Sequence, residues 1–265
     1  MIVIADPNQV LTVEQRAGGA AVVLAPALRR RFRTTRPSRS AVRPAFSLAD
    51  RRLAEGGQIV AADGNRSRQY LCAKRAFDVV GAAGLLVLLS PLLLITWLVL
   101  MVTTRGKPVY KQERLGYRGK PFTIYKFRTM VAGAASMQRQ VVNEKDGPIF
   151  KNRRDPRITA LGRLLRSTSI DEFPQLFNVL RGEMSLVGPR PPIAREVAQY
   201  EPWQRRRLSV KPGLTCLWQV SGRSEIGFVD WVRMDLWYVR NQNLLVDLRL
   251  LWKTPASVLS RRGAY

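Results

Sequence analysis

The chain has 265 residues, enough for one or two domains with a buried core, and 46% of them are hydrophobic. Its 44 Lys and Arg residues outnumber 19 Asp and Glu, and the formal net charge of +25 calls for an anionic partner such as nucleic acid, lipid headgroups or a phosphorylated substrate. Histidine is absent from the sequence, which excludes Ser-His-Asp triads and His-ligated metals. Cys72 and Cys216 lie far apart and indicate neither a zinc site nor a disulfide framework.

Residues 1–70 mix small residues, Pro and Arg without sustained periodicity, and we expect a basic, mostly disordered leader there. Acidic residues at Asp6 and Glu14, together with the missing apolar block, argue against a secretory signal. Such a basic segment would lie readily on an anionic membrane surface, and a solubilising or regulatory tail explains it equally well. The remaining residues, 71–265, are predicted to form one membrane-anchored domain.

Residues 79–102 carry no charged side chain, and about 20 apolar residues are enough to cross a bilayer core. Pro91 lies in the middle of this run and removes one backbone donor, so a helix must bend or break there. Two geometries follow, a kinked spanning helix or a hairpin that re-enters on the same face. We expect the hydroxyl of Ser90 to bind a carbonyl that the proline leaves free.

The charges that flank the apolar run favour the hairpin. Basic residues occur on both sides of it, at Lys74, Arg75, Arg105, Lys107, Lys111 and Arg114. Positive flanks normally stay on the cytoplasmic side, and a re-entrant hairpin over about residues 76–103 keeps both of them there. Asp78 is expected near the headgroups, in a local ion pair with Lys74 and Arg75.

The rest of the chain is typical of a small cytosolic α/β domain. Residues 122–128 alternate apolar with polar side chains and predict a short strand. Helices are predicted at 161–166, 173–180, 193–207, 228–240 and 244–259, several of them amphipathic enough to lie in the membrane interface. The predicted fold is therefore mixed and mainly α, with a re-entrant membrane hairpin and interfacial amphipathic helices.

Without histidine, neighbouring carboxylates close to arginine are the natural catalytic candidates. Asp171 and Glu172 form such a pair, although Ser169 and Glu172 also match a capping box, and acidic residues in a first helical turn simply complement the helix dipole. Pro174 predicts an irregular start to that helix. The spacing alone leaves the catalytic and the capping interpretations open.

Arg190 stands between prolines, and a stiff turn lowers the entropy lost when an arginine binds a phosphate. A proline-rich connector with a solvated arginine explains the same pattern. Residues 151–157 form another basic cluster around Asp155, which is either a phosphate site or a solvated loop.

Taken together and in this order, nine segments resemble the bacterial sugar transferases, the monotopic polyprenyl-phosphate phosphoglycosyl transferases, of the type that starts exopolysaccharide synthesis. The resemblance covers residues 71–265. The segments are 74–78, the apolar run with Ser90-Pro91, Lys126-Phe127-Arg128-Thr129-Met130, 155–159, Thr168-Ser169-Ile170-Asp171-Glu172-Phe173-Pro174-Gln175, 185–191, 211–215, 218–223 and Gly263-Ala264-Tyr265.

The resemblance implies an enzyme of the cytoplasmic face of a bacterial inner membrane, with a hairpin broken at Ser90-Pro91. It implies that Asp171 attacks the sugar-bound phosphate of a UDP-sugar, that UMP leaves, and that polyprenyl (undecaprenyl) phosphate accepts the sugar phosphate. Glu172 and Asp171 would bind Mg²⁺, and Arg190 would stabilise charge on the transferred group. Contacts to phosphate, nucleotide or headgroup are expected from Lys126, Arg128, Asp155, Arg157 and Arg223.

A different class of function fits the charge and the hairpin equally well: a basic membrane scaffold of a polysaccharide assembly complex, without catalysis. It leaves the Asp171-Glu172 pair beside Arg190 unexplained. Nucleic-acid binding is not expected, because the sequence has no zinc-finger spacing or RNA-recognition signature and anionic lipid accounts for the basic excess. The transferred sugar, the polyprenol length and the oligomeric state stay open.

Overall fold

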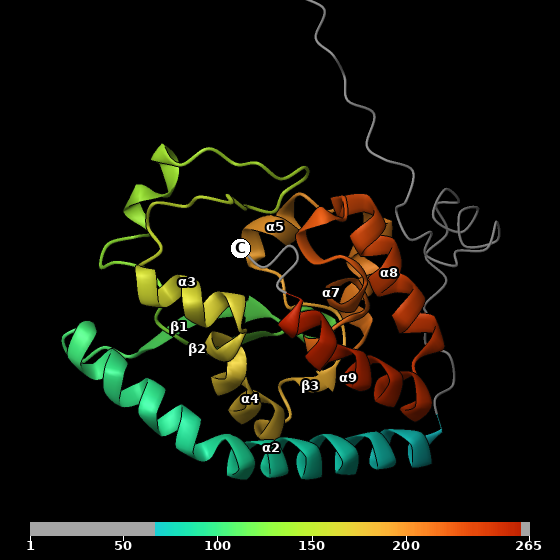
Figure 1. Ribbon diagram of the computed structural model, residues 1–265. Coiled ribbons are helices and arrows are strands. Elements are labelled where there is room, and N and C mark those ends of the chain that lie inside the picture. Colours follow the sequence, from blue (N-terminus) through green and yellow to red (C-terminus); the bar gives the residue numbers. More distant parts are fainter. Residues whose placement is uncertain (1–66, 261–265) are drawn as a thin grey trace, which may run out of the picture. The chain divides into compact units, whose positions relative to one another are not determined.

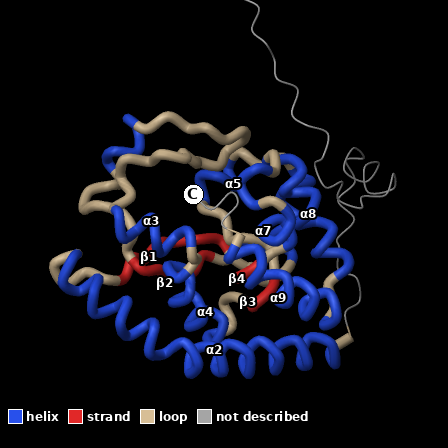
Figure 2. The backbone as a smooth tube through the Cα atoms, in the orientation of Figure 1, coloured by secondary structure: helices blue, strands red, loops and turns tan. Residues whose placement is uncertain are grey.

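The computed structural model describes residues 67–260 (Figure 1). The predicted leader lies almost entirely outside these residues, as does the closing segment 263–265. The described part is mainly helical, with two small two-stranded sheets at its centre (Figure 2). This confirms the mixed, mainly α fold that the sequence predicts.

The apolar run forms most of a single helix, α2 (Arg68–Thr103), which begins at an N-cap where Ser67 accepts a hydrogen bond from the backbone of Tyr70. Helical structure continues through Pro91, and the helix bends along its length (Figure 1). Ser90 donates its hydroxyl to the carbonyl of Val87 at 2.8 Å. That carbonyl lies four residues before the proline and has lost its helical donor, so the predicted hydrogen bond is confirmed.

Helix α2 is long and apolar enough to cross a membrane, and much of its apolar surface is exposed. Both halves nevertheless pack on the same fold, because Ala82 joins the largest core cluster and Leu100 is buried with Phe127 and Leu165. The exposed apolar side chains indicate membrane association. The structure has one bent helix rather than two arms folded back on each other, so entry and exit on the same face stay a prediction.

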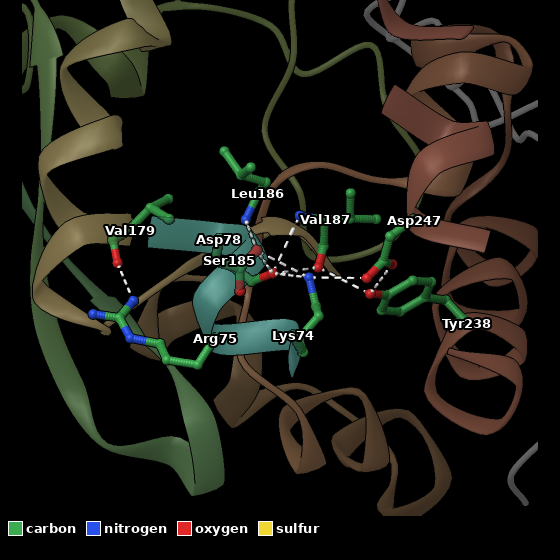
Figure 3. A network of polar contacts seen from close by, with 9 residues as sticks. All are labelled: Lys74, Arg75, Asp78, Val179, Ser185, Leu186, Val187, Tyr238 and Asp247. Carbon is green, nitrogen blue, oxygen red and sulfur yellow. Dashed lines mark hydrogen bonds and ion pairs between the residues drawn. The ribbon is translucent and has the colours of Figure 1, made fainter. Parts of the chain in front are cut away.

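A buried polar network fastens the first half of α2 (Figure 3). The ammonium of Lys74 lies 3.0 Å from a carboxylate oxygen of Asp78 and 3.0 Å from one of Asp247. Asp78 also accepts the backbone N–H of Leu186 at 3.0 Å. The predicted ion pair with Lys74 is confirmed, but Asp78 is surrounded by protein donors, and Arg75 binds elsewhere.

Arg75 instead closes the end of helix α4 (Leu176–Arg181). Its guanidinium donates to the carbonyls of Val179 and Leu180 at 2.6 and 2.7 Å. Carbonyls in the last turn of a helix have no partner within the helix, so a cation there both satisfies and neutralises them. Arg75 therefore ties the membrane helix to the segment that follows the Asp171-Glu172 pair.

The first sheet is the antiparallel hairpin of β1 (Val109–Leu115) and β2 (Pro121–Phe127), with Val109 opposite Phe127 and the short turn η1 (Tyr117–Gly119) between the strands. Strand β2 confirms the strand predicted over 122–128. The second sheet pairs β3 (Ser185–Val187) with β4 (Gly213–Thr215) in parallel. At this sheet the backbones of the two segments come very close: a Cβ on Gly213 would lie 2.0 Å from the nitrogen of Gly188. Position 213 therefore requires glycine.

Three predicted helices are confirmed within two residues, as α3 (Ala160–Ser167), α8 (Phe228–Asn241) and α9 (Leu244–Leu259). The helix predicted over 173–180 divides into a 3₁₀ helix, η3 (Ile170–Gln175), and α4. The remaining helices are short: η2 (Ser136–Gln140), α7 (Leu217–Ser221) and η5 (Arg223–Glu225).

The prediction of one helix over 193–207 is wrong. The segment forms α5 (Ala194–Ala198), α6 (Pro202–Arg205) and η4 (Arg206–Ser209). Pro202 starts α6, and the residue before a proline avoids the helical region, as Glu201 does with φ −64° and ψ 156°. The proline therefore ends one helix and begins the next.

Lys74→Met should destabilise the fold by about 3–5 kcal/mol, because it leaves the buried carboxylates of Asp78 and Asp247 without their counter-charge. The matched control is Arg233→Met, which removes a half-exposed partner of Asp230 on α8 and should cost less than about 1 kcal/mol. Urea unfolding of the detergent-solubilised proteins measures both. Equal losses of stability in the two variants would show that the Lys74 network stabilises the fold no more than an exposed ion pair does.

Candidate active site

The Asp171-Glu172 pair lies on η3, directly after a backbone irregularity. Ser169 adopts a left-handed conformation with φ 57°, and its side chain makes no capping hydrogen bond. The side chain of Glu172 reaches the ammonium of Lys126 at 2.5 Å instead of the backbone before the helix. The capping-box interpretation is therefore wrong, and the irregular start expected from Pro174 is confirmed by the 3₁₀ geometry.

Strand β2 and helix α4 hold η3 in place. The side chain of Asn178, fully buried in α4, donates to the carbonyl of Thr123 at 2.7 Å and accepts the backbone N–H of Tyr125 at 3.3 Å. Lys126, the next residue on β2, then meets Glu172. The hairpin thus presents its lysine to the acidic pair through contacts between segments about 50 residues apart.

The two carboxylates have different electrostatic states. Burial raises the pKa of Asp171 to about 7, opposed by the charge of Lys126 and increased by that of Glu172. Burial also acts on Glu172, but the charge and hydrogen bond of Lys126, with help from Arg190, outweigh it and hold the pKa of Glu172 below its ordinary value. Neighbouring acids whose pKa values are driven apart are typical of sites with divided roles.

A pocket with an empty volume of about 300 Å³, open mouth included, is lined by Glu172, whereas the buried Asp171 is not among its lining residues. Polar side chains from four separate segments face it: Arg114 from β1, Lys126 from β2, Glu172 from η3 and Arg190 from the turn after β3. Its other lining residues are Ile124, Gln175, Pro191, Gly213, Leu214 and Gln219. Three cations around one carboxylate make this a pocket for an anion.

Arg190 and the turn that carries it contact several other elements. Its guanidinium lies over the ring of Trp231, 5.7 Å from the ring centroid. The two carbonyls that follow it are fixed by β1, since Arg114 donates to Pro191 at 3.0 Å and the backbone of Leu115 donates to Pro192 at 2.9 Å. Arg114 therefore lines the pocket and fixes the turn at the same time.

Two other predicted site residues, Arg223 and Arg128, differ in their relation to the acidic pair and the pocket. Arg223 in η5 is close enough for the charge of Glu172 to act on its pKa, which burial lowers. Arg128 donates to the carbonyl of Lys107 at 2.7 Å and does not line the pocket.

Asp155 and Arg157 lie outside the pocket lining and bind each other. The ion pair is buried at 2.6 Å, and the hydrogen bond from Arg157 lowers the pKa of Asp155. Arg157 also donates to the carbonyl of Ala134. The pair braces the long loop after β2, and its part in substrate binding stays a prediction.

Two cations near the acidic pair, Arg114 and Arg166, were missed at the sequence level, and a third, Lys151, was included only as part of a basic cluster. Burial, followed by the charge of Arg190, lowers the pKa of Lys151 to about 7 and that of Arg114 to about 10. Arg166 donates to the hydroxyl of Thr129 at 2.9 Å, and its charge favours ionised Asp171. No sequence motif marks Arg114 or Arg166. Lys151 belongs to the basic cluster noted above, but its approach to Arg190 depends on the tertiary structure.

Asp171 and Glu172 are also the acidic side chains of this site that could bind a metal ion. Within residues 67–260, no group of three or more acidic or cysteine side chains could hold a metal ion. Mg²⁺ often takes only one or two carboxylates when substrate phosphates and waters complete its ligands. Asp171 and Glu172 therefore fit Mg²⁺ that is bound together with a diphosphate better than a resident metal centre.

Comparisons with known proteins show which sequences this chain is similar to. The family model described as bacterial sugar transferase matches residues 69–261. The undecaprenyl-phosphate galactose phosphotransferase of Salmonella typhimurium is 45% identical over 210 residues, which covers 76% of this chain and 43% of that protein. The exopolysaccharide production protein ExoY of Rhizobium meliloti is 39% identical over 199 residues, covering 73% of this chain and 88% of that one.

A third relative, the UDP-glucose:undecaprenyl-phosphate glucose-1-phosphate transferase of Klebsiella pneumoniae, is 36% identical over 200 residues, covering 72% of this chain and 41% of that protein. The chain thus spans less than half the length of the Salmonella and Klebsiella relatives, and the family model covers most of the chain. The chain belongs to the bacterial sugar transferase family.

Proposed function

We propose that the chain transfers a hexose 1-phosphate from a UDP-sugar to undecaprenyl phosphate, the first membrane step of exopolysaccharide or O-antigen synthesis. The observation that carries the proposal is a buried carboxylate, Asp171, adjacent in the chain to Glu172, which lines a pocket together with Lys126, Arg114 and Arg190. The names of the Salmonella and Klebsiella relatives mention galactose and glucose, and hexose is the substrate class they support.

In the proposed first step, a carboxylate oxygen of Asp171 attacks the phosphorus that carries the sugar. A bond forms between that oxygen and phosphorus, the bond to the bridging oxygen breaks, and UMP leaves with the electron pair. Both reactants are anionic, so cations must surround them. Lys126, Arg114 and Arg190 face the pocket and supply that charge.

In the second step, a phosphate oxygen of the lipid attacks the same phosphorus and releases Asp171 as a carboxylate. The product is a lipid diphosphate sugar, and the enzyme returns to its first state. Glu172, already bound to Lys126, fixes the lysine beside the reacting groups. Mg²⁺, held by Asp171 and Glu172 together with the diphosphate, would neutralise charge on the substrate and on the leaving UMP.

We further propose that α2 enters and leaves the membrane on the cytoplasmic face. Both of its halves pack on the same fold, and basic residues flank both ends. Helix α9 exposes Leu245, Leu248 and Trp252 next to Arg249 and Lys253, a composition suited to the membrane interface. An enzyme fixed at headgroup depth meets its lipid substrate by diffusion in two dimensions.

Asp171→Asn should lower UMP release from UDP-glucose or UDP-galactose by at least about a thousandfold, because the amide oxygen cannot act as the nucleophile. Without lipid acceptor, intact-protein mass spectrometry should find an added sugar phosphate on the unmodified protein and none on Asp171→Asn. Asp230→Asn, an exposed acid on α8, is the matched control. Full activity of Asp171→Asn would exclude the covalent route, and no UMP release by the folded, unmodified protein would favour the scaffold.

The rate should depend on pH through Asp171. Its pKa of about 7 means that kcat/KM rises as the pH increases through neutrality, because only the ionised carboxylate attacks. Lys126 favours the ionised form of Asp171. Lys126→Met should therefore lower the rate and move this rise in kcat/KM, the acid limb of the pH profile, to higher pH. Lys111→Met, on the neighbouring strand, should leave the limb in place. An unshifted limb in Lys126→Met would contradict this electrostatic coupling.

Pro91→Ala restores the missing donor to the Val87 carbonyl and should straighten α2, so that one end crosses the membrane in part of the molecules. Cys72, exposed before the apolar run, and an introduced Arg105→Cys in a Cys72→Ser background report the two ends. A membrane-impermeant maleimide applied to intact cells should label neither end of the protein with Pro91 and one end after Pro91→Ala. Unchanged protection would mean that the proline does not determine the topology.

A further inference from the structure

A buried ion pair next to the backbone of Arg190 takes no part in the proposed chemistry. Arg207 in η4 is 2% exposed and Asp235 in α8 is 1% exposed, and their side chains form a hydrogen-bonded pair. Neither residue is among those that line the pocket. Burying two charges carries a large desolvation cost, and a hydrophobic pair of similar size often gives equal stability. The pair therefore calls for a role other than stability.

Arg207 holds the backbone of Arg190. One of its terminal nitrogens donates to the carbonyl of Arg190 at 3.2 Å, and the other donates to the hydroxyl of Tyr200 at 2.9 Å. Prolines at 189, 191 and 192 have no N–H, so this turn offers mostly acceptors and must be fixed by donors from elsewhere. Arg114 and the backbone of Leu115 donate to the carbonyls of Pro191 and Pro192, and Arg207 donates to that of Arg190.

Trp231 connects the two arginines. The guanidinium carbons of Arg190 and Arg207 each lie 5.7 Å from the centroid of its ring. Two cations sharing one ring repel each other unless one is neutralised, and Asp235, one helical turn after Trp231, neutralises Arg207. The ion pair thus lets Arg207 bind the backbone of Arg190 without driving the side chain of Arg190 away.

We propose that Arg207, neutralised by Asp235, is a positioning residue that fixes Arg190 in the pocket for a substrate phosphate. The inference rests on the proposed function, since it assumes that Arg190 binds the diphosphate of a nucleotide. Arg207 touches neither the pocket nor the reacting groups. All of its effect should therefore pass through Arg190.

The test is a double-mutant cycle in the full chain. The paired change Arg207→Met with Asp235→Leu removes both charges together and leaves no buried charge unpaired. It is made in the unmodified protein and in Arg190→Met. The matched control is Arg233→Met with Asp230→Leu, the same exchange in a partly exposed ion pair of α8 in which Arg233 donates to Asp230. Two quantities are measured, kcat/KM for UMP release and the affinity for UDP by titration calorimetry.

In the presence of Arg190, the paired change should lower both quantities roughly ten- to a hundredfold, which is the range expected when a charge-assisted hydrogen bond is lost. In Arg190→Met it should cause no further loss, because the residue through which it acts is already gone. The control pair should leave both quantities unchanged. A general loosening of the fold would instead lower them in both backgrounds.

Equal losses with and without Arg190, or no loss with Arg190 present, would overturn the positioning role. UDP binding that is absent, or that is unaffected by Arg190→Met, would also overturn it, because Arg190 would then have no phosphate to bind. If the unmodified protein releases no UMP from any UDP-sugar, the proposed transfer fails. The cycle for UDP affinity still decides the role of Arg207 in that case.

Discussion

The ion pair between Lys126 and Glu172 is the interaction on which the site depends. It joins the β1–β2 hairpin to η3, and it pairs Lys126 directly with Glu172 rather than with Asp171. Asp171 therefore remains buried with only the longer-range influence of Lys126, and burial raises its pKa to about 7. One short contact thus separates two adjacent acids into a stable carboxylate and one that titrates near neutral pH.

Around this pair the protein gathers more positive charge than its own acids can balance. Arg114, Lys126 and Arg190 line the pocket, and Lys151 lies within electrostatic reach of Arg190. Burial, followed by the charge of Arg190, lowers the pKa of Lys151 to about 7. In the proposed reaction these cations would face the diphosphate of the substrate.

The membrane helix and the pocket are parts of one polar and apolar framework. Lys74 connects α2 to α9 through Asp247 and lies beside β3, where the Leu186 backbone binds Asp78. Strand β3 leads directly into the turn that carries Arg190, and Arg207 donates a hydrogen bond to the carbonyl of Arg190. The first half of α2 and the turn that carries Arg190 are thus held by contacts within β3 and just after it.

The sequence by itself determined the features that depend on residues close together in the chain. These include the apolar helix, the Ser90 hydrogen bond at Pro91, strand β2 and three of the helices, because periodicity, proline and local hydrogen bonds act within a few residues. It left the Asp171-Glu172 pair ambiguous, since the same spacing suits a capping box and a catalytic site.

Only the tertiary structure excluded the capping box and placed Arg114 and Arg166 near the acidic pair. Glu172 meets a lysine 46 residues earlier, and Arg207 pairs with an acid 28 residues later, and no local pattern encodes such partners. The structure also paired Asp155 with Arg157 and sent Arg75 to the end of α4. The reason is physical: whether a charged side chain is free to bind a substrate depends on which opposite charge the fold brings to it.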